Sequence, residues 1–438
     1  MGHMDNKNIF RKLGRKINNL PLRAPWNETF YELLRKLYSE KEADVLVKMP
    51  YGLSDLNRVA KMTKYESSEL SKILEGLCSK GLVMDLWVND AYHYMPSPIM
   101  IGIFEFSMMR TGESVDSKAL AHLFNQYLNA DNGALYAMNA KKGNKVSVIR
   151  ALPHWDAIDP SDYMEVLDYE KAAGIVESSE KFSIGICSCR HEKFHVGEKT
   201  CEVPLDKCST FGRAADYLIR NKLAKEVSKS EMLENLAQSV EMKLVLCADN
   251  VKRNVTFICH CCKDCCNALA GISKFGYPNM VVTSSFIAKN HPDTCVGCGK
   301  CAEACPIDAI KMIPIDKPQT KKKEDPVIDA SICLGCGVCA LSCNKGAVTL
   351  ARREKRVLHP ETTFERVILQ SLERGTLQNQ IFDNPQSITQ KFMRGFVGGF
   401  LRLPPVKASL MSDMLRSSFL NAMTKGVQKQ GKRWVAEM

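Results

Sequence analysis

Nineteen of the 438 residues are cysteine, and most of them lie in four short runs. Two runs repeat one spacing, with three cysteines at gaps of two residues and a fourth after three more: Cys295, Cys298, Cys301 and Cys305, then Cys333, Cys336, Cys339 and Cys343. The odd total, the close spacing and the lack of an export signal argue against a disulfide framework. In a reducing compartment, clustered thiolates usually bind metal.

The repeated spacing fits an iron–sulfur cubane, whose four iron corners each take one thiolate. Three cysteines at two-residue gaps can wrap one face of the cubane. Glycines between them let the backbone turn tightly and direct amide hydrogens at the sulfurs: Gly297, Gly299, Gly335 and Gly337. The two runs resemble those of the bacterial dicluster ferredoxins, which hold two [4Fe–4S] clusters, and the resemblance covers residues 288–352.

The ferredoxin resemblance implies a crossed ligand assignment. One cluster would bind Cys295, Cys298, Cys301 and Cys343, and the other would bind Cys333, Cys336, Cys339 and Cys305. The sequence departs from the family at Asn344, where a proline usually follows the last cysteine, and this puts the local geometry in doubt. A pair of zinc sites is the alternative, but zinc usually takes two pairs of ligands separated by a longer loop.

Nine further cysteines form a second cysteine field: Cys187, Cys189, Cys201, Cys208, Cys259, Cys261, Cys262, Cys265 and Cys266. Its dense runs follow predicted strands at 182–186 and 255–258, so their thiols can converge at the ends of neighbouring strands. We predict at least one further iron–sulfur centre here. The thiols suffice for two cubanes or one larger cluster, and a structural zinc site or free buried thiols are the alternatives.

The order of the motifs resembles an uncharacterised group of anaerobe iron–sulfur proteins, in which C-x-C-R and C-x-C-C-x2-C-C motifs precede a dicluster ferredoxin. Here these motifs are Cys187 to Arg190 and Cys259 to Cys266. Arg190 could neutralise cluster charge or hold an anionic substrate, or simply form a salt bridge. His260 could be a ligand or a bystander, while Cys78 and Cys247 lie on apolar faces and are expected in the core.

The elements that position these residues predict an α+β multidomain chain. After a tag remnant and a basic arm at 1–26, helices capped by Asn27 and Ser54, a helix at 67–79 and a hairpin turning at Asn89-Asp90 resemble a winged helix over 27–97. A helical connector follows at 98–145. An α/β cysteine-rich domain at 146–287 includes a strand at 146–149, a helix at 169–178 and a helix capped by Ser230. The ferredoxin module then precedes a helical tail at 353–438.

Charge and apolar patterning give expectations about partners. The formal net charge is +11, with the excess near both ends, which suits a solvated surface, an acidic redox partner or an anionic membrane. Phe392, Phe396 and Phe400 are expected to pack on the protein itself, with membrane-surface contact as the alternative. Lysines of the third predicted helix are matched by glutamates, so protein docking or homodimerisation is favoured over DNA binding.

Three functions follow as hypotheses. The first is an electron-transfer protein that passes electrons through two [4Fe–4S] clusters and a further upstream cluster to a redox protein partner. The second is a reductase with the upstream cluster as its catalytic site, and the third is a redox-sensing transcription regulator that uses the winged helix. No apolar stretch approaches a membrane span and no secretory signal is evident, so a cytoplasmic location is expected, in an anaerobic cell.

Overall fold

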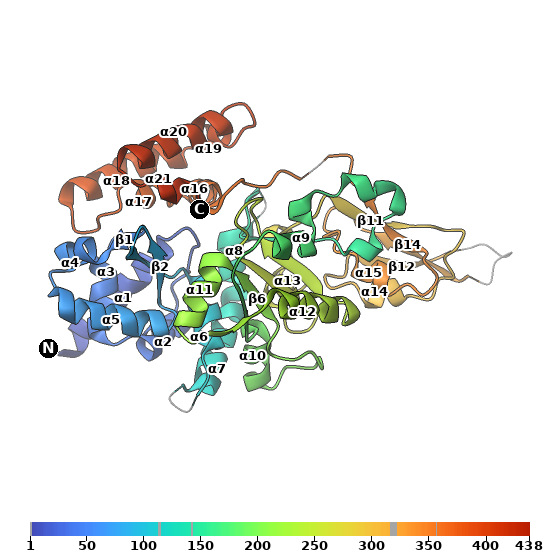
Figure 1. Cartoon of the computed structure of the whole chain (residues 1–438), viewed down its shortest axis with the longest axis horizontal. Helices are drawn as coiled ribbons and strands as arrows, with labels where there is room; N and C mark the ends of the chain where they lie inside the picture. Colours follow the sequence, from blue (N-terminus) through green and yellow to red (C-terminus); the bar gives the residue numbers. More distant parts are fainter. Residues whose placement is uncertain (1, 113–114, 142, 316–321, 356) are drawn as a thin grey trace.

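The computed structural model describes residues 2–112, 115–141, 143–315, 322–355 and 357–438. Figure 1 shows N-terminal helices beneath a layer of C-terminal helices, a mixed sheet at the centre, and the 288–352 segment at the end of the molecule opposite the N-terminus. The architecture is mixed α and β, as the sequence predicts. Among the helices of these described ranges, none has both the length and the apolar composition needed to cross a bilayer.

The N-terminal region consists of helices and a small sheet. Its elements are α1 (Gly2–Asn18), α2 (Glu28–Leu37), α3 (Glu40–Lys48), β1 (Ser54–Asp55), α4 (Leu56–Thr63), α5 (Ser67–Ser79), β2 (Val83–Val88) and β3 (Ala91–Pro96). The strands pair antiparallel in the order β1-β3-β2. Asn89 and Asp90 have positive φ at the hairpin turn, as a two-residue turn between twisted strands requires. The winged-helix interpretation of this region stays a prediction.

The predicted basic arm is wrong, because most of it is helix α1. Phe10, Leu13 and Ile17 recur at helical spacing and are buried in the core cluster that also contains residues of α2 and α3. The nearby Lys16 is buried too, and its Nζ donates to the carbonyl of Met49 at 2.5 Å. The positive charges hid an apolar helix face that holds the first helix to the domain.

Two helix starts differ from the sequence prediction by one or two residues. Asp55, not Ser54, caps α4, since its carboxylate accepts from the Arg58 amide while Ser54 pairs with Tyr94 in the sheet. The helix predicted to begin after Ser230 is α12 (Lys229–Glu241), and Ser228 caps it through a capping box with Glu231. Helix α3 was not predicted, although Ser39 and Glu42 form the same motif at its start.

Residues 98–145 are mostly helical, as predicted, and are part of the main core rather than a connector. They form η1 (Ile99–Ile103), α6 (Phe104–Met109), α7 (Ser117–Asn129), η2 (Ala130–Asn132) and α8 (Ala134–Ala140). Phe104 and Phe124 meet edge to face with ring centroids 5.1 Å apart. Their core cluster continues into strands 245–249 and 257–261 of the central sheet, through Val245 and Phe257.

Seven strands form the central sheet, in the order β10-β4-β8-β9-β6-β5-β7. They are β4 (Ile149–Ala151), β5 (Phe182–Gly185), β6 (Cys208–Phe211), β7 (Ala224–Val227), β8 (Val245–Asp249), β9 (Phe257–Cys261) and β10 (Val281–Val282). All neighbours are antiparallel except β10 and β4. On one face of the sheet, helices α9 (Ala172–Glu177) and α12 share a buried cluster with Leu246 and Ile258. On the other face, α13 (Asn267–Ser273) belongs to the cluster that contains Val245 and Phe257.

Several predicted elements of this domain are displaced. The strand predicted at 146–149 is β4, and the helix predicted at 169–178 is a short turn, η5 (Asp168–Glu170), followed by α9. Helices α10 (Ser188–Val196) and α11 (Gly212–Arg220) and the turns η3 (Trp155–Ala157), η4 (Pro160–Glu165) and η6 (Pro278–Met280) complete the domain. The strands that precede the two dense cysteine runs are not neighbours, because β6 lies between β5 and β9.

The 288–352 segment has two small hairpin-like sheets. Strand β11 (Phe286–Asn290) pairs with β14 (Val348–Arg352), and β12 (Ile310–Pro314) pairs with β13 (Glu324–Ile328). The short helices α14 (Lys300–Glu303) and α15 (Val338–Leu341) follow Gly299 and Gly337. A bridge between Ile158 and Leu350 attaches the segment to the central domain.

The tail is helical, as predicted. It contains α16 (Thr363–Arg374), α17 (Leu377–Ile381), α18 (Ile388–Arg402), α19 (Pro404–Leu410), α20 (Arg416–Lys429) and α21 (Arg433–Ala436). Gly375 ends α16 in the left-handed conformation. The tail reaches the N-terminal region through an ion pair of 2.7 Å between Arg58 and Asp383.

The expectation that the tail phenylalanines pack on the protein is wrong. Phe392, Phe396 and Phe400 are 72%, 71% and 56% exposed, and Ile388 on the same face of α18 is 86% exposed. The helix is instead held from its other side, where Gly398 and Leu401 are buried. The structure therefore leaves an exposed apolar stripe along α18.

The role of α1 can be tested by truncating one of its core side chains. Leu13→Ala should lower the free energy of unfolding by about 2–5 kcal/mol, because Leu13 is fully buried and its loss leaves a cavity. Chemical denaturation followed by circular dichroism measures the change. The matched control Lys12→Ala, at an exposed position of the same helix, should change it by less than about 0.5 kcal/mol. Equal small effects would mean that α1 does not contribute to the core.

Candidate metal-binding cysteine sites

Cys301 of the 288–352 segment has thiols of both cysteine runs near it. Burial raises the pKa of Cys301, and the nearby thiols of Cys295 and Cys343 raise it further. Cys298 is exposed, whereas Cys301 is buried. Cys301 therefore has neighbours from both runs, Cys295 from its own and Cys343 from the other, while the thiol of Cys298 lies at the surface.

The second set lies deeper. Cys305, Cys333, Cys336 and Cys339 are all buried. Burial raises the pKa of Cys336 to about 12, with further contributions from Cys333 and Cys305. Burial also raises the pKa of Cys339, which is influenced by Cys301 of the first set as well. Because burial disfavours the thiolate form, these thiols would lose their protons only where a bound cation supplies compensating positive charge.

The backbone around both runs is arranged to donate to sulfur. The amide of Ala309 donates to Sγ of Cys305 at 3.2 Å, and the amide of Ala347 donates to Sγ of Cys343 at 3.3 Å. The two bonds have the same spacing along the chain, so this hydrogen bond forms beside Asn344 as it does beside Pro306. Such bonds tune cluster potential.

Most thiols of the second cysteine field line one large cavity of about 1060 Å³. Antiparallel pairing places the end of β5, the start of β6 and the end of β9 at one edge of the sheet. Helix α10 begins at the same edge, directly after Cys187. Six thiols that line this cavity are called here the cavity cysteines: Cys187, Cys189, Cys208, Cys259, Cys261 and Cys266.

The cavity cysteines form a continuous series of neighbouring thiols. Cys208 is next to Cys259, which is next to Cys261, and the series continues through Cys266 and Cys189 to Cys187. Hydrogen bonding with the neighbouring thiols and burial raise the pKa of Cys187, Cys259 and Cys261. The predicted strand ended at 258, whereas Cys259 and Cys261 lie within β9. Cys208 is the first residue of β6, the strand that lies between β9 and the β5 strand before Cys187.

Three other thiols of the field form a compact group, here called the three-cysteine group: Cys201, Cys262 and Cys265. Sγ of Cys201 lies 3.6 Å from Sγ of Cys262 and 3.6 Å from Sγ of Cys265. Hydrogen bonding with Cys265 lowers the pKa of Cys262 to about 5, helped by the charge of Arg190 and opposed by burial. Cys262 also lines the cavity, so the two groups of thiols adjoin.

Arg190 lies between these two groups, beside the thiols of Cys187, Cys261 and Cys262. It is 1% exposed, and its guanidinium donates to the carbonyls of His260 and Pro204. Among the described residues, no acidic side chain forms an ion pair with it, and its Nε has no hydrogen-bond partner. Burial alone would lower its pKa, but the thiols of Cys187, Cys262 and Cys261 raise it. The salt-bridge interpretation therefore fails, and neutralisation of thiolate charge is supported.

His260 and the two expected core cysteines have different surroundings. His260 lies on the face of β9 opposite to Cys259 and Cys261, where Ser209 Oγ is 2.8 Å from its Nε2. Burial lowers its pKa to about 3. Cys78 is a core residue, as predicted. Cys247 is fully buried as expected, yet it pairs with Cys259 across β8 and β9 and contacts the field.

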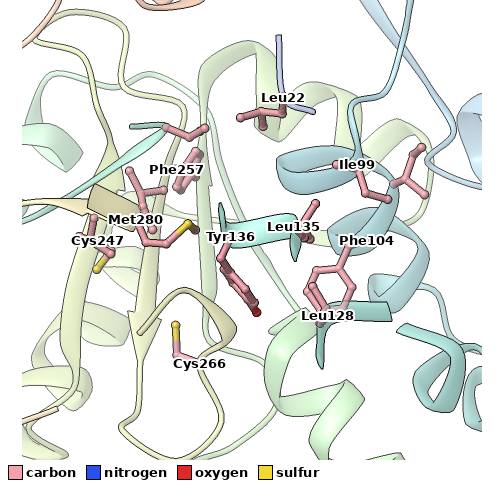
Figure 2. Close-up of a cluster of buried hydrophobic side chains, with 14 of the residues drawn as sticks. Leu22, Ile99, Phe104, Leu128, Leu135, Tyr136, Cys247, Phe257, Cys266 and Met280 are labelled. Carbon is pink, nitrogen blue, oxygen red and sulfur yellow. The ribbon is translucent and has the colours of Figure 1, made fainter. Parts of the chain in front are cut away.

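Part of the cavity lining is apolar and includes Leu22, Phe104, Leu128, Tyr136 and Met280. Figure 2 shows these side chains in one buried cluster with Cys247 and Cys266. Burial and the nearby thiols of Cys189 and Cys266 raise the pKa of the Tyr136 hydroxyl. Glu105 belongs to the same wall, and burial raises its pKa to about 7. Sequence reasoning missed both residues, because no motif marks a side chain that meets the cysteines only through the fold.

Glu192 fixes the two dense runs to each other. It is fully buried in α10, and its carboxylate accepts from Asn267 at 3.1 Å and from Asn125 at 2.7 Å. Asn267 follows Cys266 directly, so this contact sets the position of Cys266 relative to Cys189 of α10. Side chains of this kind orient metal ligands from behind.

Comparison with known proteins agrees with the geometry of the C-terminal set. Residues 294–347 match the family of 4Fe-4S dicluster domains. That match supports iron–sulfur binding and an electron-transfer role for this segment. No curated protein and no solved structure matches the chain.

The ferredoxin turns can be tested with two glycines of equal backbone conformation. Gly335 and Gly346 have φ of 64° and 62°, so an alanine at either costs about 1–2 kcal/mol of backbone strain. A Cβ at Gly335 would also collide with the Phe286 carbonyl and the Ser284 hydroxyl, whereas one at Gly346 would meet nothing within 4 Å. Gly335→Ala should therefore lose about half of the iron of the module, and Gly346→Ala should keep it. Iron and sulfide analysis after anaerobic reconstitution measures both, and equal retention would contradict the turn geometry.

Proposed function

We propose that the chain is an electron-transfer protein in which two [4Fe–4S] clusters of the 288–352 segment exchange electrons with a further iron–sulfur centre held by the cavity cysteines. The dicluster match supports the first part. Six thiols around one cavity, with a buried arginine beside them, support the second. Buried thiolates need this positive charge or a metal, because an isolated buried charge is very unfavourable.

The contact that carries the proposal lies at Cys247. Hydrogen bonding with Cys261 lowers its pKa, but burial and the nearby thiols of Cys266, Cys259 and Cys336 outweigh this effect and raise it. Cys336 belongs to the second ferredoxin set, whereas Cys261 is a cavity cysteine. Cys247 thus feels the charge of thiols from both the cavity cysteines and the second ferredoxin set.

The backbone next to Cys247 fixes the two centres relative to each other. The amide of His154 donates to the carbonyl of Cys336 at 3.0 Å, and Nε2 of His154 lies 2.7 Å from the carbonyl of Leu244 at the start of β8. The Asp159 amide of the central domain donates to the carbonyl of Leu350 in the ferredoxin segment at 2.9 Å. A rigid junction of this kind keeps the separation between redox centres constant, which supports transfer along this route.

The exposed end of the route supports a redox protein partner. Cys298 is exposed, and the neighbouring Val296 is 53% exposed. A donor or acceptor that docks here would meet the first cluster before the second. The basic net charge of the chain favours an acidic partner.

Counting iron tests the proposal directly. After anaerobic reconstitution the wild type should hold about 12 irons or more per chain, and Cys189→Ser with Cys266→Ser should reduce this to about 8, because only the ferredoxin clusters remain. The control Cys78→Ser, buried in the core away from the field, should keep the wild-type count. A wild type with about 8 irons would remove the upstream centre.

A reductase is a second candidate, favoured by Glu105 on the cavity wall. A group with a pKa of about 7 in this position could supply protons to a molecule reduced at the thiol-bound centre. The volume of the cavity exceeds what a cubane needs and leaves space for such a molecule.

The titration of Glu105 can be observed by infrared difference spectroscopy. The wild type should show a carboxylic-acid band that fades as pH rises through about 7, since the raised pKa keeps the proton on Glu105 below that pH. Glu105→Gln should abolish this band. The control Glu180→Gln, at an exposed position of the same wall, should leave it unchanged. A band that persists in Glu105→Gln would remove Glu105 as the proton donor.

The remaining partner hypotheses differ in their support. The exposed face of α5 presents Glu69 and Glu75 beside Lys72, which does not favour contact with DNA phosphates. A regulator function therefore has little support, and docking or dimerisation remains the proposed role of this region. The stripe on α18, with exposed Lys391 beside it, supports contact with an anionic membrane surface.

A further inference from the structure

The three-cysteine group differs from the series of cavity cysteines in that all three of its sulfurs lie close to one another. Cys201 lies 3.6 Å from both Cys262 and Cys265 by their Sγ atoms, and all three sulfurs lie within 4.8 Å of one another. Thiolates around one tetrahedral zinc ion, with Zn–S bonds of about 2.3 Å, stand about 3.8 Å apart. The thiolates of a cubane sit on different irons and are therefore farther apart. The observed spacing is that of ligands sharing one ion.

The local fold holds these thiols together without the rest of the field. Cys262 and Cys265 are joined by a tight turn after β9, in which the Cys266 amide donates to the Cys262 carbonyl at 3.4 Å. Cys201 comes from the segment between α10 and β6, and it packs with Leu244 and Val203 against this turn. Two cysteines separated by two residues plus a distant third is a frequent arrangement around a single zinc ion.

The charge of the surroundings matches such an ion. A divalent cation with three thiolates carries a net charge of −1, which the adjacent Arg190 would neutralise. Arg190 is 1% exposed and its Nε has no hydrogen-bond partner within the described ranges. A buried guanidinium without a carboxylate needs an anionic neighbour. A metal–thiolate complex at Cys262 would satisfy that need.

We propose that Cys201, Cys262 and Cys265 bind a single tetrahedral metal ion of the Zn²⁺ class, with the fourth position open to water or a small ligand. Because Cys262 also lines the cavity, the ion lies at the cavity wall. The six cavity cysteines remain available for an iron–sulfur centre. The proposal therefore goes beyond electron transfer and does not depend on it.

Metal analysis of the full-length protein with its iron–sulfur clusters loaded tests this site. The wild type should retain about one zinc per chain after gel filtration. Cys201→Ser and Cys265→Ser should each weaken zinc binding by more than about 100-fold, since losing a ligand costs more than losing an outer partner. Iron and acid-labile sulfide should not change. The matched control Cys208→Ser, a cavity cysteine outside the group, should keep the zinc.

Cobalt provides a second readout that needs no variant. After zinc is removed by chelation, Co²⁺ should bind at about one per chain and give the visible spectrum of tetrahedral thiolate-bound cobalt, and added zinc should displace it. A wild type that binds neither zinc nor cobalt would overturn the proposal. So would Cys201→Ser and Cys265→Ser proteins that lose iron and sulfide together, because the three thiols would then be cluster ligands. Failure of the upstream iron count alone would leave the zinc result intact.

Discussion

A positive charge buried without an acidic partner is the constraint around which the cysteine-rich domain is organised. Arg190 is fixed by the carbonyls of His260 and Pro204, so the start of α10, the segment before β6 and the end of β9 meet at its guanidinium. Thiols alone can supply the negative charge it needs within the described part of this site. If the upstream field binds metal as proposed, folding of these three segments and metal binding would be thermodynamically coupled.

The same sheet joins this charge to the ferredoxin segment. Strand β8 carries Cys247 on the face of the cavity cysteines. Just before this strand, the Leu244 carbonyl contacts Nε2 of His154, and the amide of His154 donates to the carbonyl of Cys336. The two thiol-rich regions thus pack against each other through buried residues and are not domains joined by a flexible linker. Motions that would change the distance between them must first break core packing.

Sequence reasoning found what is encoded locally and missed what depends on long-range packing. The ferredoxin runs, their glycine turns, α5, the Asn89-Asp90 hairpin and the end of α16 at Gly375 all follow from short-range patterns. The insertion of β6 between β5 and β9 depends on topology, which periodicity does not contain. Two predictions of burial were wrong. The many basic residues of α1 made its buried apolar face hard to recognise, and the apolar spacing of the α18 phenylalanines predicted burial although these side chains are exposed.

The two ferredoxin sets differ in exposure, with Cys298 at the surface and every thiol of the second set buried. An added electron makes a cluster more negative, and a buried site disfavours that change more than a solvated one. If each set holds a cluster as proposed, burial by itself would give the outer cluster the higher reduction potential. In that arrangement an electron entering at the surface would have to move to a site of lower potential to reach the interior, so the difference in burial would set the driving force for inward transfer.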